Sequence, residues 1–128
     1  MEFMIKENIE EPGVIVLSPV GKIDSDTSAV LEKKIKTCLL QNPNTLVIDL
    51  QDVDFMTSAG VGVMMKAKTL INKNNGNFAM INPQPQIKKV FEIMRLVPTL
   101  NVFANTEELD EYLNKVQRKI TGREDEGF

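Results

Sequence analysis

The segment from Val53 to Gly62 is the part of the chain best suited to regulated chemistry, because two hydroxyl side chains fall at a predicted helix start. Thr57 and Ser58 follow a connecting loop, and a helical apolar pattern begins directly behind them. A serine there has two compatible roles. As an N-cap, its oxygen accepts a hydrogen bond from a free backbone N–H, worth about 1 kcal/mol. As a phosphorylation site, it holds about two negative charges at the positive end of the helix dipole.

Two glycines follow the hydroxyl pair. We expect Gly60 and Gly62 to let the helix approach the sheet closely, which is the simplest reason for glycine inside a helix. No Gly-Lys-Ser or Gly-Lys-Thr sequence follows them, so the segment does not match a nucleotide phosphate-binding loop. From these residues alone, the helix cap is the simpler interpretation of Ser58.

Carboxylates near this segment are the other candidates for chemistry. Asp49 and Asp52 are three positions apart and face opposite ways on a strand, whereas Asp52 and Asp54 share a side. We interpret all three as solvated loop carboxylates rather than as a metal or acid–base site. Asp24 and Asp26 precede another predicted helix, and we expect Asp26 to cap it.

The missing residue types exclude several kinds of enzyme. The 128 residues contain no His, so a Ser-His triad, a Cys-His pair and an imidazole zinc site are absent. Cys38 is the only cysteine, and its place in an apolar helical row indicates inert packing. We therefore predict a protein that is not an enzyme and has no metal site and no cofactor.

The net charge of −3 comes entirely from residues 107–128, which carry seven acidic and four basic side chains. The preceding residues carry eleven of each, and we expect the helical lysines among them to lie on solvated faces. A neutral body argues against nucleic acid and against an anionic membrane surface as partners. No apolar run approaches the roughly 20 residues of a spanning helix, and residues 1–11 have no signal-peptide block. We expect a cytoplasmic protein without membrane insertion.

Strands and helices alternate along the chain and must position the hydroxyl pair. The expected strands are residues 3–8, 14–17, 46–50, 78–81 and 100–103, the second of them closed by Pro19 and Gly21. The expected helices have apolar rows made of Leu31, Ile35, Cys38 and Leu39; Gly60, Met64, Ala67 and Ile71; Ile87, Val90, Phe91 and Met94; and Leu109, Tyr112, Leu113 and Val116, with Asn105 or Thr106 capping the last.

This order predicts one α/β domain with a mixed central β-sheet of four to five strands and about four helices. The domain is expected to occupy residues 1–117, and residues 118–128 to form a charged, flexible C-terminal tail. Beside the helix start, Met56, Val61 and Met65 are candidates for a docking surface because flexible apolar side chains suit one, although a broad core-facing stripe explains them nearly as well. Val61 and Met65 are four positions apart and are expected to be partly exposed.

Three blocks together resemble a STAS domain of the anti-sigma factor antagonist class. They are Gly21-Lys22-Ile23-Asp24, Leu46-Val47-Ile48-Asp49-Leu50, and Phe55-Met56-Thr57-Ser58-Ala59-Gly60-Val61-Gly62-Val63, which is the strongest match. The resemblance is carried by their order and spacing, and it is clearest from Asn44 to Leu113.

The resemblance implies a regulator that switches partners. Such an antagonist binds an anti-sigma factor, often a serine kinase, and releases the sigma factor. The kinase phosphorylates a Ser at the start of this helix, and a serine phosphatase restores the protein. The matching residue is Ser58, with Thr57 as second candidate, and Asp24 matches an Asp close to the acceptor. The expected partner-binding residues are therefore Asp24, Met56, Thr57, Ser58, Val61 and Met65.

The chain departs from the family pattern on both sides of the acceptor. Phosphorylated members commonly have an acidic residue before the Ser and a second hydroxyl residue after it, where this chain has Thr57 and Ala59. This departure motivates an alternative, a non-switching STAS subunit of a lipid-transport complex or of a stress-sensing scaffold.

Overall fold

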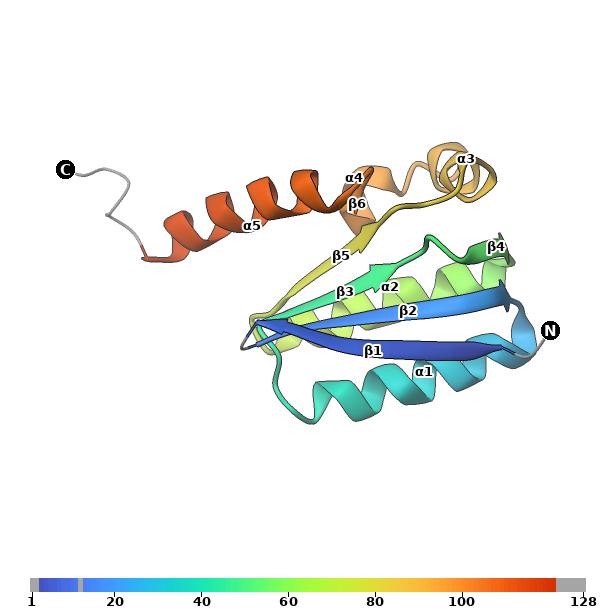
Figure 1. Cartoon of the computed structure of the whole chain (residues 1–128), viewed down its shortest axis with the longest axis horizontal. Helices are drawn as coiled ribbons and strands as arrows, with labels where there is room; N and C mark the ends of the chain where they lie inside the picture. Colours follow the sequence, from blue (N-terminus) through green and yellow to red (C-terminus); the bar gives the residue numbers. More distant parts are fainter. Residues whose placement is uncertain (1–2, 12, 122–128) are drawn as a thin grey trace.

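The structure is a computed structural model that describes residues 3–11 and 13–121 (Figure 1). Within these residues the chain forms six strands and five helices around one central sheet. In chain order they are β1 (Met4–Glu11), β2 (Val14–Ile23), α1 (Ser25–Leu39), β3 (Thr45–Asp49), β4 (Val53–Met56), α2 (Ser58–Lys73), β5 (Asn77–Ile81), α3 (Pro85–Ile93), α4 (Val97–Leu100), β6 (Val102–Phe103) and α5 (Thr106–Thr121).

The sheet is mixed, as the sequence predicts. Its order is β1-β2-β3-β5-β6, with β1 antiparallel to β2 and the remaining neighbours parallel. β4 lies off this path and pairs in parallel with the C-terminal end of β2. The additional strand is β4, which the sequence places in a loop, and the additional helix is the single turn α4. Both are too short for a recognisable hydrophobic period.

β2 does not end at Pro19 and Gly21, so the predicted strand boundary is wrong. Pro19 is paired with Ile5 of β1 and is buried. Gly21 has a φ of +112° next to a register shift in the β2–β4 pairing, a conformation that glycine adopts without steric cost. The strand can therefore continue to Ile23, and this extension forms the pairing with β4.

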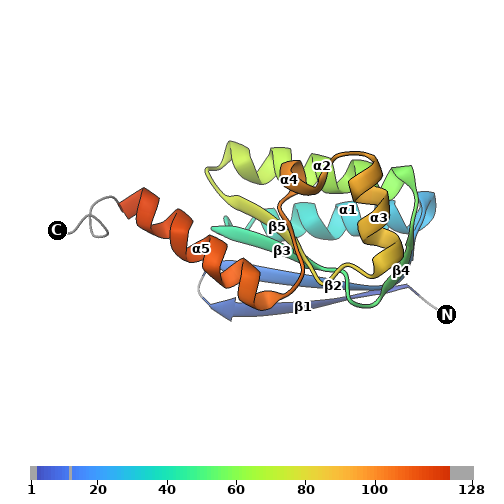
Figure 2. The same cartoon turned by 90° about the horizontal axis from the view of Figure 1, so that it is seen from above.

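Both faces of the sheet are buried where β3 and β5 lie. Leu46 and Ile48 of β3 belong to the larger core, which also holds the apolar faces of α1 and α2. Val47, between them, faces the opposite side and packs with Leu109 of α5. Figures 1 and 2 show α1 and α2 on one side of the sheet and α5 on the other. This alternation explains the nearly continuous apolar run that predicts β3.

The C-terminal region differs from its prediction at two points. The strand expected at 100–103 is reduced to β6, and Leu100 is instead buried in α4. The last helix begins as predicted, with the Asn105 Oδ1 accepting a hydrogen bond from the Glu108 N–H at 2.9 Å. α5 continues to Thr121, four residues into the segment expected as a tail. Residues 122–128 and the side chain of Val116 lie outside the described residues.

None of the helices in the described part of the chain is long and apolar enough to cross a membrane. The same residues contain no group of three or more His, Cys, Asp or Glu side chains that could hold a metal ion.

Candidate functional site

Ser58 is the first residue of α2 and follows β4 with one residue between them. Its side chain is exposed, and within the described residues it forms no hydrogen bond. The N-cap of α2 is Thr57, so the interpretation of Ser58 as the N-cap is wrong. The reason is tertiary: the Thr57 N–H donates to the Ile23 carbonyl oxygen of β2 at 3.0 Å, which sets where the strand ends and the helix begins.

The start of α2 lacks a side-chain cap. The Thr57 Oγ1 donates to the Ile23 carbonyl oxygen at 3.4 Å and accepts no helix N–H. The first turn also contains no acidic residue. The amides of this turn and the positive end of the helix dipole therefore have no carboxylate partner from the helix itself, which is a favourable environment for an added phosphate.

The start of α1 is capped instead by Asp24. Its Oδ1 accepts hydrogen bonds from the N–H groups of Asp26 and Thr27, both at 3.0 Å, and the Asp24 N–H donates to the Thr27 Oγ1 at 2.8 Å. The Thr27 N–H lowers the pKa of the Asp24 carboxyl; burial opposes this shift and the N–H of Asp26 adds to it. The expectation that Asp26 caps α1 is wrong, because the helix begins two residues earlier than an Asp26 cap requires and Asp26 lies inside its first turn.

The parallel pairing of β2 with β4 brings the starts of α1 and α2 together. Ile23 is the register partner of Met56, and each is the last residue of its strand. Asp24 and Thr57 are the next residues of the two chains, so Asp24 lies at the strand end adjacent to the hydroxyl pair. The structure thus brings Asp24, Thr57 and Ser58 to one edge of the sheet.

The apolar candidates divide into buried and exposed residues. Met56 is 6% exposed and Val61 is 2% exposed, so both pack into the core. The expected partial exposure of Val61 is therefore wrong, and neither side chain is available at the surface, because both belong to the main core. Met65 is 43% exposed, as the sequence predicts.

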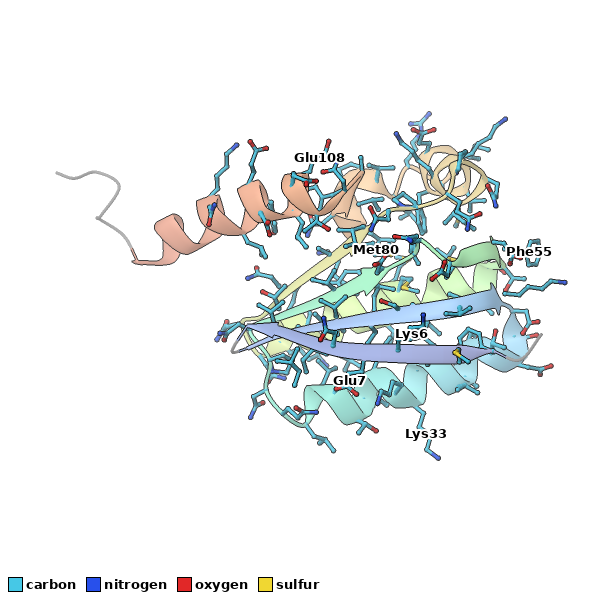
Figure 3. The ribbon with its side chains drawn as sticks, viewed as in Figure 1. Lys6, Glu7, Lys33, Phe55, Met80 and Glu108 are labelled. Atoms are coloured by element: carbon cyan, nitrogen blue, oxygen red, sulfur yellow. The ribbon has the colours of Figure 1, made fainter. Side chains whose placement is uncertain are left out.

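Sequence reasoning missed Phe55 as a surface residue. It is 50% exposed at the end of β4, two residues before the hydroxyl pair (Figure 3). Phe55 is exposed because it lies on the outer side of β4, and this four-residue strand is too short to be recognised from a hydrophobic pattern. The sequence signal that could have indicated a surface aromatic residue is the position of Phe55 next to Asp54 in a segment expected to be a loop.

The two glycines of α2 have different surroundings. A Cβ added at Gly60 would lie 2.7 Å from the Ile23 Cγ2 and 2.7 Å from the Met56 Cγ, so this helix turn needs glycine to approach β2 and β4. A Cβ added at Gly62 meets no atom within 4 Å. Close approach to the sheet therefore explains Gly60 and does not explain Gly62.

The loop carboxylates do not converge. The Asp49 Oδ1 accepts hydrogen bonds from the Gln51 N–H at 3.0 Å and from the Asn82 Nδ2 at 3.1 Å. Asp52 and Asp54 are exposed. The exposure of Asp52 and Asp54 agrees with the prediction of solvated carboxylates, whereas Asp49 is half-buried at the end of β3 and closes the turn after it.

Cys38 and two of the helical lysines have structural contacts. Cys38 is 1% exposed, and burial raises the pKa of its thiol. Lys34 forms an ion pair with Glu7 of β1 at 2.6 Å, and Lys36 pairs with Glu32 at 3.1 Å. These lysines are thus ion-paired as well as solvated.

Comparison with known proteins identifies relatives over most of the chain. A family model described as STAS domain matches residues 6–109. The anti-sigma-F factor antagonist RsfB of Mycobacterium tuberculosis is 33% identical over 92 residues, which cover 72% of this chain and 75% of RsfB.

Solved structures share the fold. An anti-sigma factor antagonist from Mycobacterium paratuberculosis superposes with a TM-score of 0.76 at 27% identity, covering 91% of this chain and 95% of that one. The Bacillus cell fate determinant SpoIIAA in its phosphorylated form superposes with a TM-score of 0.67 at 23% identity, covering 86% and 99%.

The capping geometry predicts that Asp24→Ala lowers the melting temperature more than Asp26→Ala does. The folded pKa of Asp24 lies below its unfolded value, so its contribution is present above the ordinary carboxyl pKa and is lost as the pH falls through the folded value. Thermal unfolding at neutral and at acidic pH measures both effects. Equal losses for the two variants at neutral pH would contradict the assignment of the cap.

The two glycines predict opposite effects on stability. Gly60→Ala crowds Ile23 and Met56 and should lower the free energy of unfolding by about 1–3 kcal/mol. Gly62→Ala adds an exposed methyl group to a helix and should raise it by up to about 1 kcal/mol. Urea denaturation of both variants measures the difference, and a loss of stability in Gly62→Ala would show that Gly62 has a packing role.

Proposed function

This chain belongs to the STAS domain family, and we propose that it is an anti-sigma factor antagonist that acts by phosphorylation-controlled partner switching. In this proposal the unphosphorylated protein binds an anti-sigma factor of the serine kinase type and thereby frees a sigma factor. The protein acts by binding, without a catalytic step of its own. The relatives named anti-sigma factor antagonists support the class of function.

One observation supports Ser58 as the switch: its hydroxyl is exposed at a helix start that has no side-chain cap. The kinase transfers the γ-phosphoryl group of ATP to the Ser58 Oγ, ADP leaves, and the hydroxyl proton passes to a base of the kinase. A serine phosphatase reverses the change by hydrolysis of the phosphate ester. Thr57 is the weaker candidate because its hydroxyl already donates to the Ile23 carbonyl oxygen and is half-buried.

A phosphate at Ser58 changes the local surface strongly. It adds about two negative charges to a segment where Asp24 already carries one at the adjacent strand end. Such a group at a contact surface disfavours binding, because its charge must be desolvated and because it repels acidic groups of the partner. We include the exposed or half-buried residues Asp24, Thr57, Ser58 and Met65 in the proposed contact surface.

The residues flanking Ser58 favour a specific competing function. Thr57 and Ala59 stand where phosphorylated members commonly carry an acidic and a hydroxyl residue. A STAS subunit that does not switch, in a lipid-transport complex or a stress-sensing scaffold, needs no acceptor at this position. The two functions differ in their partners, since affinity capture followed by mass spectrometry would recover an anti-sigma factor for the first and a transport ATPase or scaffold subunit for the second.

Phosphorylation is tested with the purified anti-sigma factor kinase and ATP. We expect the wild-type protein to gain one phosphate by intact-mass spectrometry, Ser58→Ala to gain none, and Thr57→Ala to gain one. A single phosphate that persists in Ser58→Ala and disappears in Thr57→Ala would move the switch to Thr57.

The effect of charge at Ser58 is tested by binding. We expect Ser58→Asp to bind the anti-sigma factor at least about tenfold more weakly than wild type, because one carboxylate reproduces part of the phosphate charge. Ser58→Asn is the matched control, since it has nearly the same size without the charge and should bind close to wild type. Equal affinities of Ser58→Asp and wild type would remove the electrostatic switch.

A further inference from the structure

We propose that the anti-sigma factor binds the exposed face of α2 through a helix or backbone segment that carries carboxylates and approaches α2 closely at Gly62. This inference rests on the proposed function and specifies the chemistry of the partner. It follows from the charge of this face and from the surroundings of Gly62.

Seven residues define the exposed face of α2. They recur at helical spacing, so their side-chain positions share one side of the helix. All seven are exposed, and the residues that face the opposite way are buried. The α2 face consists of Ser58, Gly62, Met65, Lys66, Thr69, Asn72 and Lys73.

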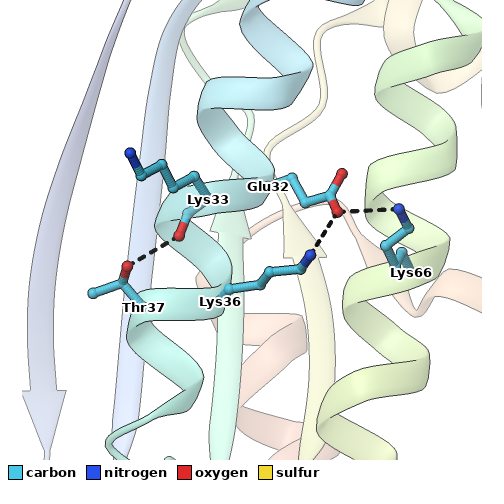
Figure 4. Close-up of polar contacts among 5 residues, drawn as sticks. All are labelled: Glu32, Lys33, Lys36, Thr37 and Lys66. Carbon is cyan, nitrogen blue, oxygen red and sulfur yellow. Dashed lines mark hydrogen bonds and ion pairs between the residues drawn. The ribbon is translucent and has the colours of Figure 1, made fainter.

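The α2 face is positively charged. α2 contains no acidic residue, and Lys66 and Lys73 both lie on the face. Lys66 shares the single carboxylate of Glu32 with Lys36, at 3.0 Å and 3.1 Å (Figure 4). Hydrogen bonds from Lys66 and then Lys36 lower the pKa of Glu32, so this carboxylate stays ionised and still neutralises only one of two ammonium groups. Within the described residues Lys73 has no ion pair.

Gly62 lies at the middle of the N-terminal half of this face. Its helical conformation does not need glycine, and a Cβ there meets nothing within 4 Å. Glycine in an exposed helix interior lowers stability relative to alanine, so folding gives no reason for it. What its missing side chain provides is an open stretch of helix backbone, beside the 43% exposed Met65, to which a second segment can come close.

The positive charge of the α2 face accounts for the expected loss of binding when Ser58 is phosphorylated. Ser58 is one turn before Gly62 on the same face, whereas the lysines are two and four turns from Ser58. A partner whose carboxylates are attracted by Lys66 and Lys73 meets like charge when Ser58 carries a phosphate. A basic partner would instead be attracted by that phosphate, and phosphorylation would then strengthen the complex.

The test measures binding of the purified anti-sigma factor by isothermal titration calorimetry. Lys66→Glu should bind about tenfold more weakly, with a smaller dependence on salt than wild type. Lys33→Glu is the matched control, since it makes the same charge change at an exposed side chain of α1 that points away from α2 (Figure 4); it should bind within about threefold of wild type.

The close approach is tested by adding a side chain. Gly62→Leu should weaken binding by about tenfold or more, whereas Ala104→Leu, which adds an exposed side chain before α5, should not. Gly62→Ala should also bind more weakly while its melting temperature rises, a combination that a folding defect cannot produce. Circular dichroism of each variant reports the fold.

The outcomes separate the two proposals. If wild type binds and Lys66→Glu and Gly62→Leu bind equally well, the assignment of the α2 face is wrong and the proposed function stands. If Lys66→Glu strengthens binding, the partner surface is basic and the proposal is overturned. If wild type does not bind an anti-sigma factor, the proposed function itself fails.

Discussion

The arrangement of the site depends on β2, because one strand must pair with three others. Its first part pairs with β1 and β3, and its last three residues pair with β4. The change of partner requires an irregularity, which Gly21 supplies with its positive φ beside the register shift. Without the extension of β2 to Ile23, no carbonyl would be present to receive the Thr57 N–H. The start of α2 and its exposed serine would then have no defined position.

The two helices that start at this edge satisfy their first turns differently. α1 has a capping box in which Asp24 and Thr27 exchange hydrogen bonds, so its free amides are occupied by its own side chains. α2 has neither a side-chain cap nor an acidic first-turn residue. A helix start without a cap is less stable by about 1 kcal/mol. In a phosphorylation switch the same feature leaves the positive end of the helix available to the incoming charge.

The exposed and buried sides of α2 also have different requirements. The buried side is tightly packed, with no room for a Cβ at Gly60 beside Ile23 and Met56, and with Val61 and Met64 buried. The exposed side carries lysines, a flexible methionine and a glycine that packing does not require. Mutations on the buried side would act through stability, whereas those on the α2 face can change binding while the fold is retained. This separation makes the contact surface accessible to experiment.

The sequence by itself determined the class of fold, most of the element order and the segment that holds Ser58, because hydrophobic period and turn residues are local properties. It also placed Met64 in the core and Met65 on the surface, from their positions in one helical pattern. Tertiary structure decided that Thr57 is the N-cap of α2, that β2 passes Pro19 and Gly21, and that Val61 and Met56 are buried while Phe55 is exposed. Each of these depends on a partner strand distant in the sequence, since the Ile23 carbonyl fixes the end of β4 and the pairing with β2 sets which sides of β4 and α2 face the core. A hydrophobic pattern indicates whether a segment is a helix or a strand, but it does not indicate which distant strand the segment pairs with.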